Sequence, residues 1–149
     1  MEISNDAQAV IFRLNKALNK YEFLVLFRFD KEKNKNHCRL IKGGVKKGEA
    51  PKDAVIREVE EEVGIKGVSI TANIHQYDYV AGGVLHKVLV FLIDASAINF
   101  DLRISSSGEG GFTIKSIKWL DKENALKQLN FLDEKKVINI ASIYLKKKA

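Results

Sequence analysis

Residues Gly43 to Ile65 read GGVKKGEAPKDAVIREVEEEVGI, a glycine-rich segment followed by an acidic one. Pro51 suits the first turn of a helix, because the N–H that proline lacks would have no helical partner there. Asp53 adds negative charge near the positive end of the helix dipole. Gly64 can adopt the left-handed conformation that often ends a helix. We therefore predict a glycine-rich loop followed by a helix over about 51–63.

The predicted helix has an apolar stripe and an acidic arc. At about 100° per residue, Val55, Val59 and Val63 share one stripe, which can pack on a sheet. Three glutamates lie within an arc of about 100° on another side of the helix, namely Glu58, Glu61 and Glu62. Within the predicted helix no lysine lies at i+4 among them to relieve their mutual repulsion, so a divalent cation would explain the arrangement. The alternative is an ordinary solvated acidic face.

The segment also matches a longer pattern, Gly-x5-Glu-x7-Arg-Glu-U-x-Glu-Glu-x-Gly-U, where U is a bulky aliphatic residue. The residues that fill its fixed positions are Gly43, Glu49, Arg57, Glu58, Val59, Glu61, Glu62, Gly64 and Ile65. This pattern resembles the signature of the Nudix hydrolases. The resemblance implies an α/β fold of the Nudix type, an α/β/α sandwich with a mixed, partly antiparallel sheet. It also implies hydrolysis of a nucleoside diphosphate linked to another group.

The resemblance further implies a metal-dependent reaction, in which Mg²⁺ or Mn²⁺ neutralises the phosphates and activates water. Glu58, Glu61 and Glu62 are the implied metal ligands, with Gly43 beside them, and Glu58 or Glu62 can also orient the attacking water. Gly43 and Gly44 would let the backbone approach the metal and the phosphates closely, although a simple tight turn would also explain both glycines.

Five more residues are candidates for the site. We expect Glu49 and Arg57 to form an ion pair that ties the loop to the helix, although Glu49 could also contact the metal. Lys42 precedes the glycines and could contact a phosphate or lie in solvent. Many Nudix enzymes take another acid from a distant loop; Glu109, in a glycine-rich loop, is the candidate here, or else an ordinary exposed glutamate. Tyr77 could stack on a base or pack in the core.

Composition sets wider bounds on the protein. A length of 149 residues fits one domain spanning residues 1–149, with a sizeable core. The net charge of +6 favours anionic partners such as nucleotides or RNA, although lysines also serve solubility. Cys38 is the only cysteine, so no intramolecular disulfide can form. No segment reads as a signal peptide or membrane span, so we expect a cytoplasmic protein, either monomer or homodimer.

Outside the acidic helix, the apolar pattern predicts strands and two further helices. The expected strands cover residues 7–14, 22–29, 39–41, 68–74, 76–80, 86–94 and 112–119. Polar loops are expected at 30–36 and 100–111, and a turn at 81–83. Asp121 can cap a helix that runs to about Leu129, and Asp133 can cap a last helix. Strands interleaved with three helices suggest one α/β sandwich.

Smaller similarities bear on the substrate. The segment Lys42-Gly43-Gly44-Val45 looks like the lysine-glycine opening of diadenosine polyphosphate and diphosphoinositol polyphosphate hydrolases, with Ile41 where those enzymes have proline. A dinucleoside polyphosphate of the diadenosine tetraphosphate type is therefore the first expected substrate. A nucleoside triphosphate pyrophosphatase and an RNA 5′-pyrophosphohydrolase are alternatives. A non-catalytic Nudix-fold module that binds nucleotide or RNA is an alternative of another class, against which the intact set of glutamates argues.

Overall fold

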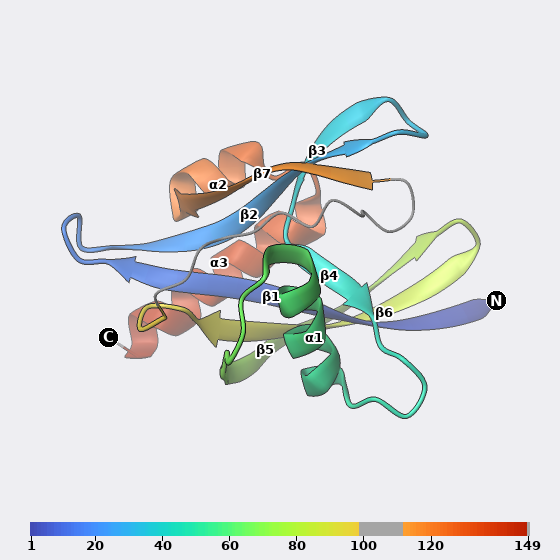
Figure 1. The fold of residues 1–149 in the computed structure, drawn as a ribbon, viewed down its shortest axis with the longest axis horizontal. Coiled ribbons are helices and arrows are strands. Elements are labelled where there is room, and N and C mark those ends of the chain that lie inside the picture. Colours follow the sequence, from blue (N-terminus) through green and yellow to red (C-terminus); the bar gives the residue numbers. More distant parts are fainter. Residues whose placement is uncertain (99–111, 149) are drawn as a thin grey trace.

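The computed structural model describes residues 1–98 and 112–148, and the structural statements below concern this part of the chain. Its elements follow one another as strands with three interspersed helices (Figure 1). In chain order they are β1 (Glu2–Asn15), β2 (Lys20–Asp30), β3 (Lys35–Arg39), β4 (Ile41–Gly44), α1 (Pro51–Val63), β5 (Ile70–Ala81), β6 (Val84–Asp94), β7 (Phe112–Asp121), α2 (Lys122–Gln128) and α3 (Leu132–Lys148).

The described strands form one mixed, seven-stranded sheet. Its main path runs β3-β2-β1-β6-β5, while β4 pairs with β1 and β7 pairs with β2. β1 and β6 are parallel, and the other pairs are antiparallel. One edge of β1 pairs with β4 through residues 6–9 and with β2 through residues 12–15. The sheet therefore forks where β1 and β2 part, and β4 follows β1 along one branch.

Helices cover both faces of the sheet (Figure 1). Because strand residues alternate between faces, Ala9 and Ile11 pack in a core with α1, whereas Val10 and Phe12 pack in a second core with α2 and α3. We call these two sides of the sheet the α1 face and the α3 face. The predicted α/β/α sandwich with a mixed sheet is thus confirmed.

Some predicted strand limits were wrong. β1 begins at Glu2 rather than at residue 7, because its polar first residues pair in parallel with β6. The two strands predicted at 68–74 and 76–80 are one strand, β5, with a register shift between Asn73 and His75. The loop predicted at 30–36 contains the first residues of β3. The loop predicted at 100–111 falls outside the described residues.

The helices are closer to expectation. α1 begins at Pro51 and ends before Gly64, which has a φ of 74°. Asp121 caps α2, because its carboxylate accepts a hydrogen bond of 2.9 Å from the backbone N–H of Asn124. Asp133 was wrongly predicted to cap the last helix. α3 begins one residue earlier, at Leu132, and the N–H of Lys135 donates to the carbonyl of Phe131 (3.1 Å).

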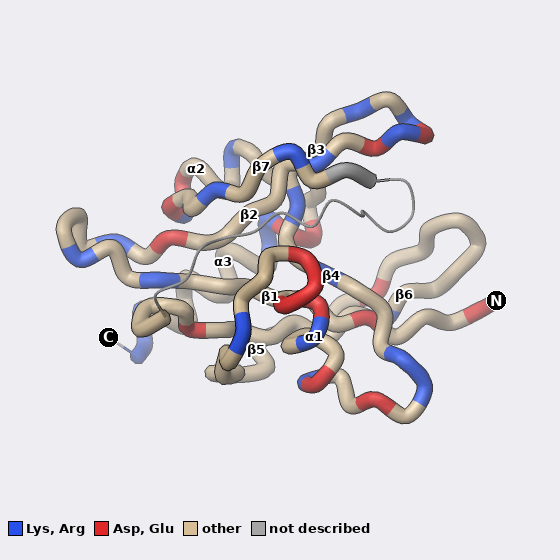
Figure 2. The backbone as a smooth tube through the Cα atoms, in the orientation of Figure 1, with Lys and Arg blue, Asp and Glu red and all other residues tan. Residues whose placement is uncertain are grey.

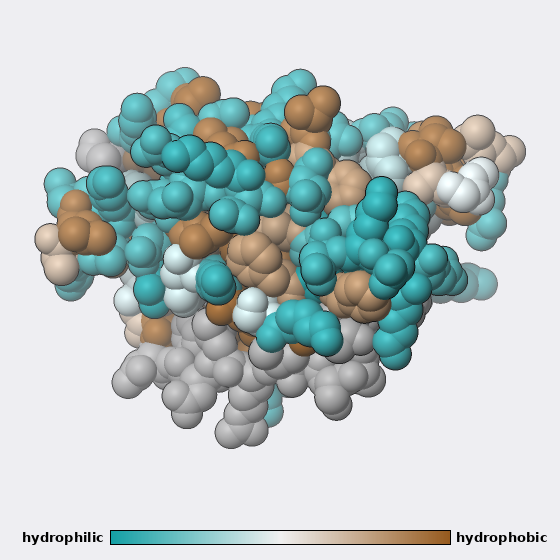
Figure 3. Space-filling view, turned by 90° about the horizontal axis from the view of Figure 1, so that it is seen from above, coloured by the Kyte–Doolittle hydropathy of each residue, from teal (hydrophilic) through white to brown (hydrophobic). Residues whose placement is uncertain are grey.

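The face of the molecule shown in Figure 3 has both hydrophilic and hydrophobic residues at its surface. Hydrophobic residues are scattered among more numerous hydrophilic ones on that face (Figure 3). Among the described helices, none has the length and apolar character that crossing a membrane requires.

Candidate active site

The two glycines that open the acidic segment lie in a strand. Gly43 and Gly44 belong to β4 and pair with Ala7 and Asp6 of β1, and neither has a positive φ. The predicted loop therefore starts later, and the alternative of a tight turn at these glycines is wrong, because their backbone is held in the ladder. The loop glycine with a left-handed backbone is Gly48, whose φ is 81°.

At Gly43 the constraint is steric and does not come from the backbone conformation. A Cβ atom at this position would overlap the carboxylate of Glu58, which reaches from α1 onto β4. At Gly44, by contrast, a Cβ would meet no atom within 4 Å. Glu58 is only 5% exposed. The missing side chain of Gly43 thus makes the space in which a buried carboxylate lies against the strand.

Arg57 joins the strand, the loop and the helix. Its Nε and Nη2 donate to the two carboxylate oxygens of Glu49, both at 2.9 Å, and Nη2 also donates to the carbonyl of Gly44 at 3.0 Å. The expected ion pair between Glu49 and Arg57 is therefore present. The hydrogen bond from Arg57, followed by that from the backbone N–H of Lys46, lowers the pKa of Glu49 to about 2. The same partner, Glu49, raises the pKa of Arg57.

Arg57 also reduces the repulsion among the glutamates of α1. Its Nη1 donates to Glu58 at 2.8 Å and to Glu61, four residues further along the helix, at 3.2 Å. The positive charge that no lysine at i+4 within the helix provides is thus supplied in part by Arg57, which lies four residues before Glu61. Figure 2 shows acidic residues along α1 and basic residues in the loop between β4 and α1.

The three predicted ligands extend from the interior to solvent along α1. Glu58 is buried, Glu62 is partly buried, and the side chain of Glu61 is 47% exposed. Within residues 1–98 and 112–148, no three histidine, cysteine or acidic side chains converge into a ready-made metal site. The available donors are nevertheless carboxylate oxygens, those of Glu58 lying in the space that Gly43 leaves, and such donors fit a hard cation such as Mg²⁺ or Mn²⁺.

Lys42 lies on the α3 face, away from Glu58. It pairs with Gln8 in the ladder, and its Nζ lies 2.9 Å from a carboxylate oxygen of Asp6 and 5.1 Å from the ring centroid of Tyr79. Burial acts to raise the pKa of Asp6, but Lys42, Ser4 and His86 together hold that pKa below its ordinary value. The structure therefore does not bring Lys42 together with the acidic arc of α1.

Tyr77 also lies on the α3 face, in a row of rings. Its ring stacks between those of His75 and Tyr79, with centroids 6.0 and 6.2 Å away, and Tyr79 stacks on His86 at 4.5 Å. The hydroxyl of Tyr77 donates to Oε1 of Gln8 at 2.9 Å, and burial raises its pKa. His75 and His86 were not among the predicted site residues. The two-residue spacing of His75, Tyr77 and Tyr79 along one strand was a signal for this row.

Glu134 is a buried charged residue that the sequence prediction missed. Its carboxylate accepts hydrogen bonds from Nε of Arg39 (2.7 Å), from the backbone N–H of Leu40 (3.1 Å) and from Nε2 of Gln8 (2.8 Å). Burial raises its pKa, while Arg39 acts in the opposite direction. A signal was available, because Glu134 shares one helical stripe with Val137, Ile138 and Ala141. Glu109 lies outside the described residues.

The chain is similar to several proteins of known structure. A search of curated proteins found no match. C. elegans Ap4A hydrolase, solved as a binary complex, is 26% identical, with a TM-score of 0.79 over 96% of this chain and 98% of that chain. The MutT protein of Methanosarcina mazei Go1 is 24% identical, with a TM-score of 0.68 over 93% and 94% of the two chains.

The MutT protein and a third structure, each less than 25% identical to this chain, show a likeness of fold alone. The NUDIX domain of Shewanella oneidensis NrtR, solved with ADP ribose, is 14% identical, with a TM-score of 0.77 over 97% of this chain and 90% of that chain. Finally, the family model described as NUDIX domain matches residues 5–139, which is most of the sequence. With this match, the sandwich fold and the complete signature on β4 and α1, the chain belongs to the NUDIX domain family and is a Nudix pyrophosphohydrolase.

Proposed function

We propose that this enzyme cleaves a phosphoanhydride bond in a dinucleoside polyphosphate such as diadenosine tetraphosphate, with Mg²⁺ or Mn²⁺ as cofactor. The observation that carries the hydrolytic part is the carboxylate of Glu58 seated over Gly43, on the same arc as Glu61 and Glu62. The choice of substrate rests on the likeness to C. elegans Ap4A hydrolase along nearly the whole chain.

The chain's own residues would act as follows. Glu58, Glu61 and Glu62 would hold the cation, with the backbone of Gly43 beside it. When bound, the cation supplies neutralisation of the phosphates and acidification of water. Arg57 positions Glu58 and Glu61 through its hydrogen bonds and ties them to Glu49. Glu58 or Glu62 would orient the attacking water and accept its proton.

Substrate contacts by Lys42, Gly44 and Tyr77 remain predictions, as does a catalytic role for Glu109. Lys42 would have to exchange Asp6 for a phosphate, because the two side chains are 2.9 Å apart. The ring of Tyr77 already stacks with those of His75 and Tyr79, so a base could stack on Tyr77 only by displacing one of these rings. The carbonyl of Gly44 is already an acceptor for Arg57, which favours a supporting role for this residue.

The test is a panel of substrates with identified products. Purified protein is incubated with diadenosine tetraphosphate, nucleoside triphosphates, ADP-ribose and 5′-triphosphorylated RNA, in Mg²⁺ or Mn²⁺ and again with chelator. We expect the highest kcat/KM for diadenosine tetraphosphate and none of this activity with chelator. Release of ATP with AMP, or of two ADP molecules, identifies the bond that is cut.

Other outcomes would replace the proposal. A preference for triphosphorylated RNA would favour the RNA alternative, which the net charge of +6 supports. A preference for nucleoside triphosphates would favour a pyrophosphatase. If no substrate of the panel is hydrolysed but nucleotide still binds, a non-catalytic module would be favoured.

A further inference from the structure

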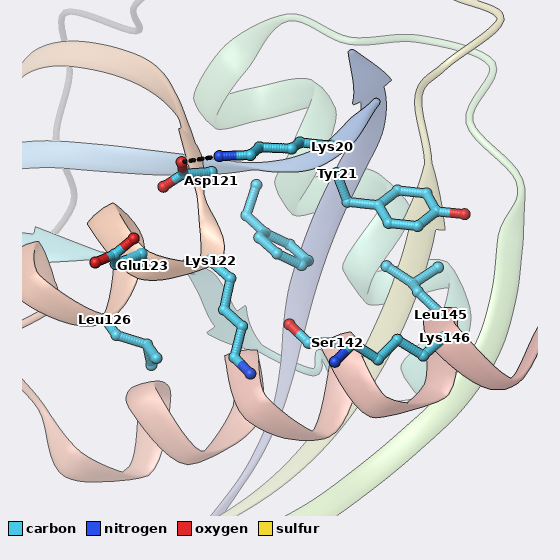
Figure 4. Close-up of a pocket in the computed structure, with 10 residues that line it drawn as sticks. Lys20, Tyr21, Asp121, Lys122, Glu123, Leu126, Ser142, Leu145 and Lys146 are labelled. Atoms are coloured by element: carbon cyan, nitrogen blue, oxygen red, sulfur yellow. Dashed lines mark ion pairs between the residues drawn. The ribbon is translucent and has the colours of Figure 1, made fainter. Parts of the chain in front are cut away.

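A cavity lies on the α3 face, on the opposite side of the sheet from Glu58 (Figure 4). It has a volume of about 460 Å³ and lies among the start of β2, α2 and the C-terminal half of α3. This size is within the range of cavities that hold small molecules, roughly 300–1,000 Å³. None of the residues placed above in the hydrolytic site lines it.

The lining is apolar on one side. Phe23 and Leu145 are buried, at 1% and 5% exposure, and Tyr21 and Leu126 are partly buried beside them. These side chains come from β2, α2 and α3, and all four belong to or pack against the core of the α3 face. The cavity therefore offers a hydrocarbon-like wall that continues the core to the surface.

The mouth of the cavity carries a positive charge, because each of the two acidic side chains that line it is paired with a lysine. Asp121 lies 3.9 Å from Lys20, and Glu123 lies 3.8 Å from Lys127. Lys122 and Lys146 also line the cavity, and within the described part of the chain neither forms an ion pair.

The two remaining lysines are placed to act together. Figure 4 shows Lys122 of α2 and Lys146 of α3 extending to the end of the cavity where Ser142 lies. The hydroxyl of Ser142 already donates to the carbonyl of Ile138, at 2.9 Å. The ammonium groups are therefore the donors available at this end, and they suit an anionic head group.

We propose that this cavity binds a small amphipathic carboxylate, such as a medium-chain fatty acid. The hydrocarbon chain would lie on Phe23, Leu126 and Leu145, and the carboxylate would lie between Lys122 and Lys146. Burial of the chain supplies affinity, and the two ammonium groups fix the orientation and select for the anion. The proposal does not rest on the substrate of the hydrolytic site, because the two sites share no residue.

The experiment is a titration of the full chain with decanoate, below its micellar concentration, followed by backbone amide NMR. We expect saturable shifts centred on Tyr21, Leu126 and Leu145. The double variant Lys122→Ala/Lys146→Ala should bind at least about tenfold more weakly, because it lacks both charge-assisted contacts. The matched control, Lys136→Ala/Lys147→Ala, removes the same charge from exposed positions outside the lining and should bind within about twofold of the unmodified chain.

Several results would overturn the proposal. These are the lack of saturation, shifts centred on α1 instead of the cavity, or binding of decan-1-ol as tight as that of decanoate. Equal weakening in the two double variants would also overturn it, because net charge rather than this site would then attract the anion. All four lysines are exposed, and the spectrum of each variant reports directly whether it is folded.

Discussion

Each face of the sheet carries a buried glutamate held by an arginine, and the two differ in their surroundings. On the α3 face, Glu134 accepts from Arg39, from the backbone of Leu40 and from Gln8, three donors fixed within the fold. On the α1 face, Glu58 is bonded to Arg57 and lies at the inner end of an acidic row that reaches solvent at Glu61. The first arrangement serves the fold, and the second is suited to a cation from solution.

The largest expected effect is on stability, at Glu134. Glu134→Ala leaves Arg39 and the N–H of Leu40 without their buried acceptor, so the free energy of unfolding should fall by about 3–5 kcal/mol. Urea unfolding measures the change. Asp133→Ala, at the exposed neighbouring position, is the control and should stay within about 0.5 kcal/mol. If the free energy of unfolding fell by less than about 1 kcal/mol in Glu134→Ala, the structural role assigned to Glu134 would be contradicted.

The next effect is on turnover, at Glu61. Glu61→Gln removes a charge from the acidic row, and kcat/KM should fall at least about 100-fold. Stability should change by no more than about 0.5 kcal/mol, because the ion pair with Arg57 is at the surface. Glu60→Gln is the control on the solvent side of the same helix and should retain activity. Equal losses in both variants would show that the helix's total charge matters and not this arc.

A smaller effect on turnover is expected at Gly43. Gly43→Ala places a methyl group where the carboxylate of Glu58 lies, so Glu58 must move and kcat/KM should fall about tenfold or more. Gly44→Ala adds the same methyl group in open space and should leave kcat/KM within about twofold. Steady-state kinetics on the two variants would compare the effect of one added methyl group at two neighbouring positions. Identical kinetics would separate Gly43 from the site.

The smallest effect concerns pH. The pKa of Glu49 is about 2, below the ordinary value of 4.5, so its bond with Arg57 stabilises the fold fully above pH 4.5 and loses this contribution as the pH falls toward 2. The stability difference between the unmodified chain and Glu49→Gln should therefore be constant above pH 4.5 and shrink below it. Urea unfolding between pH 2.5 and 7 measures this difference. A stability difference as large at pH 2.5 as at pH 7 would contradict the lowered pKa of Glu49.

The two faces also differ in how far the sequence predicted them. The limits of α1 and the choice of its glutamates followed from local features, such as Pro51, Gly64 and the spacing of acids along one helix. The position of Lys42 depends on its partner in the ladder, Gln8, and the contacts of Glu134 join residues 94 to 126 positions apart. No local pattern specifies such pairings, because alternate strand residues change face with a single step in register.

The register of β4 against β1 decides which residue of β4 lies against Glu58. In the present register, Ile41 is buried with α1, and the next residue but one on that side is a glycine. Sliding β4 by one position along β1 would send Ile41 to the opposite layer and drive the ammonium group of Lys42 into the space that the carboxylate now occupies. The apolar anchoring of one isoleucine thus reserves this space for a carboxylate and keeps an ammonium group out of it.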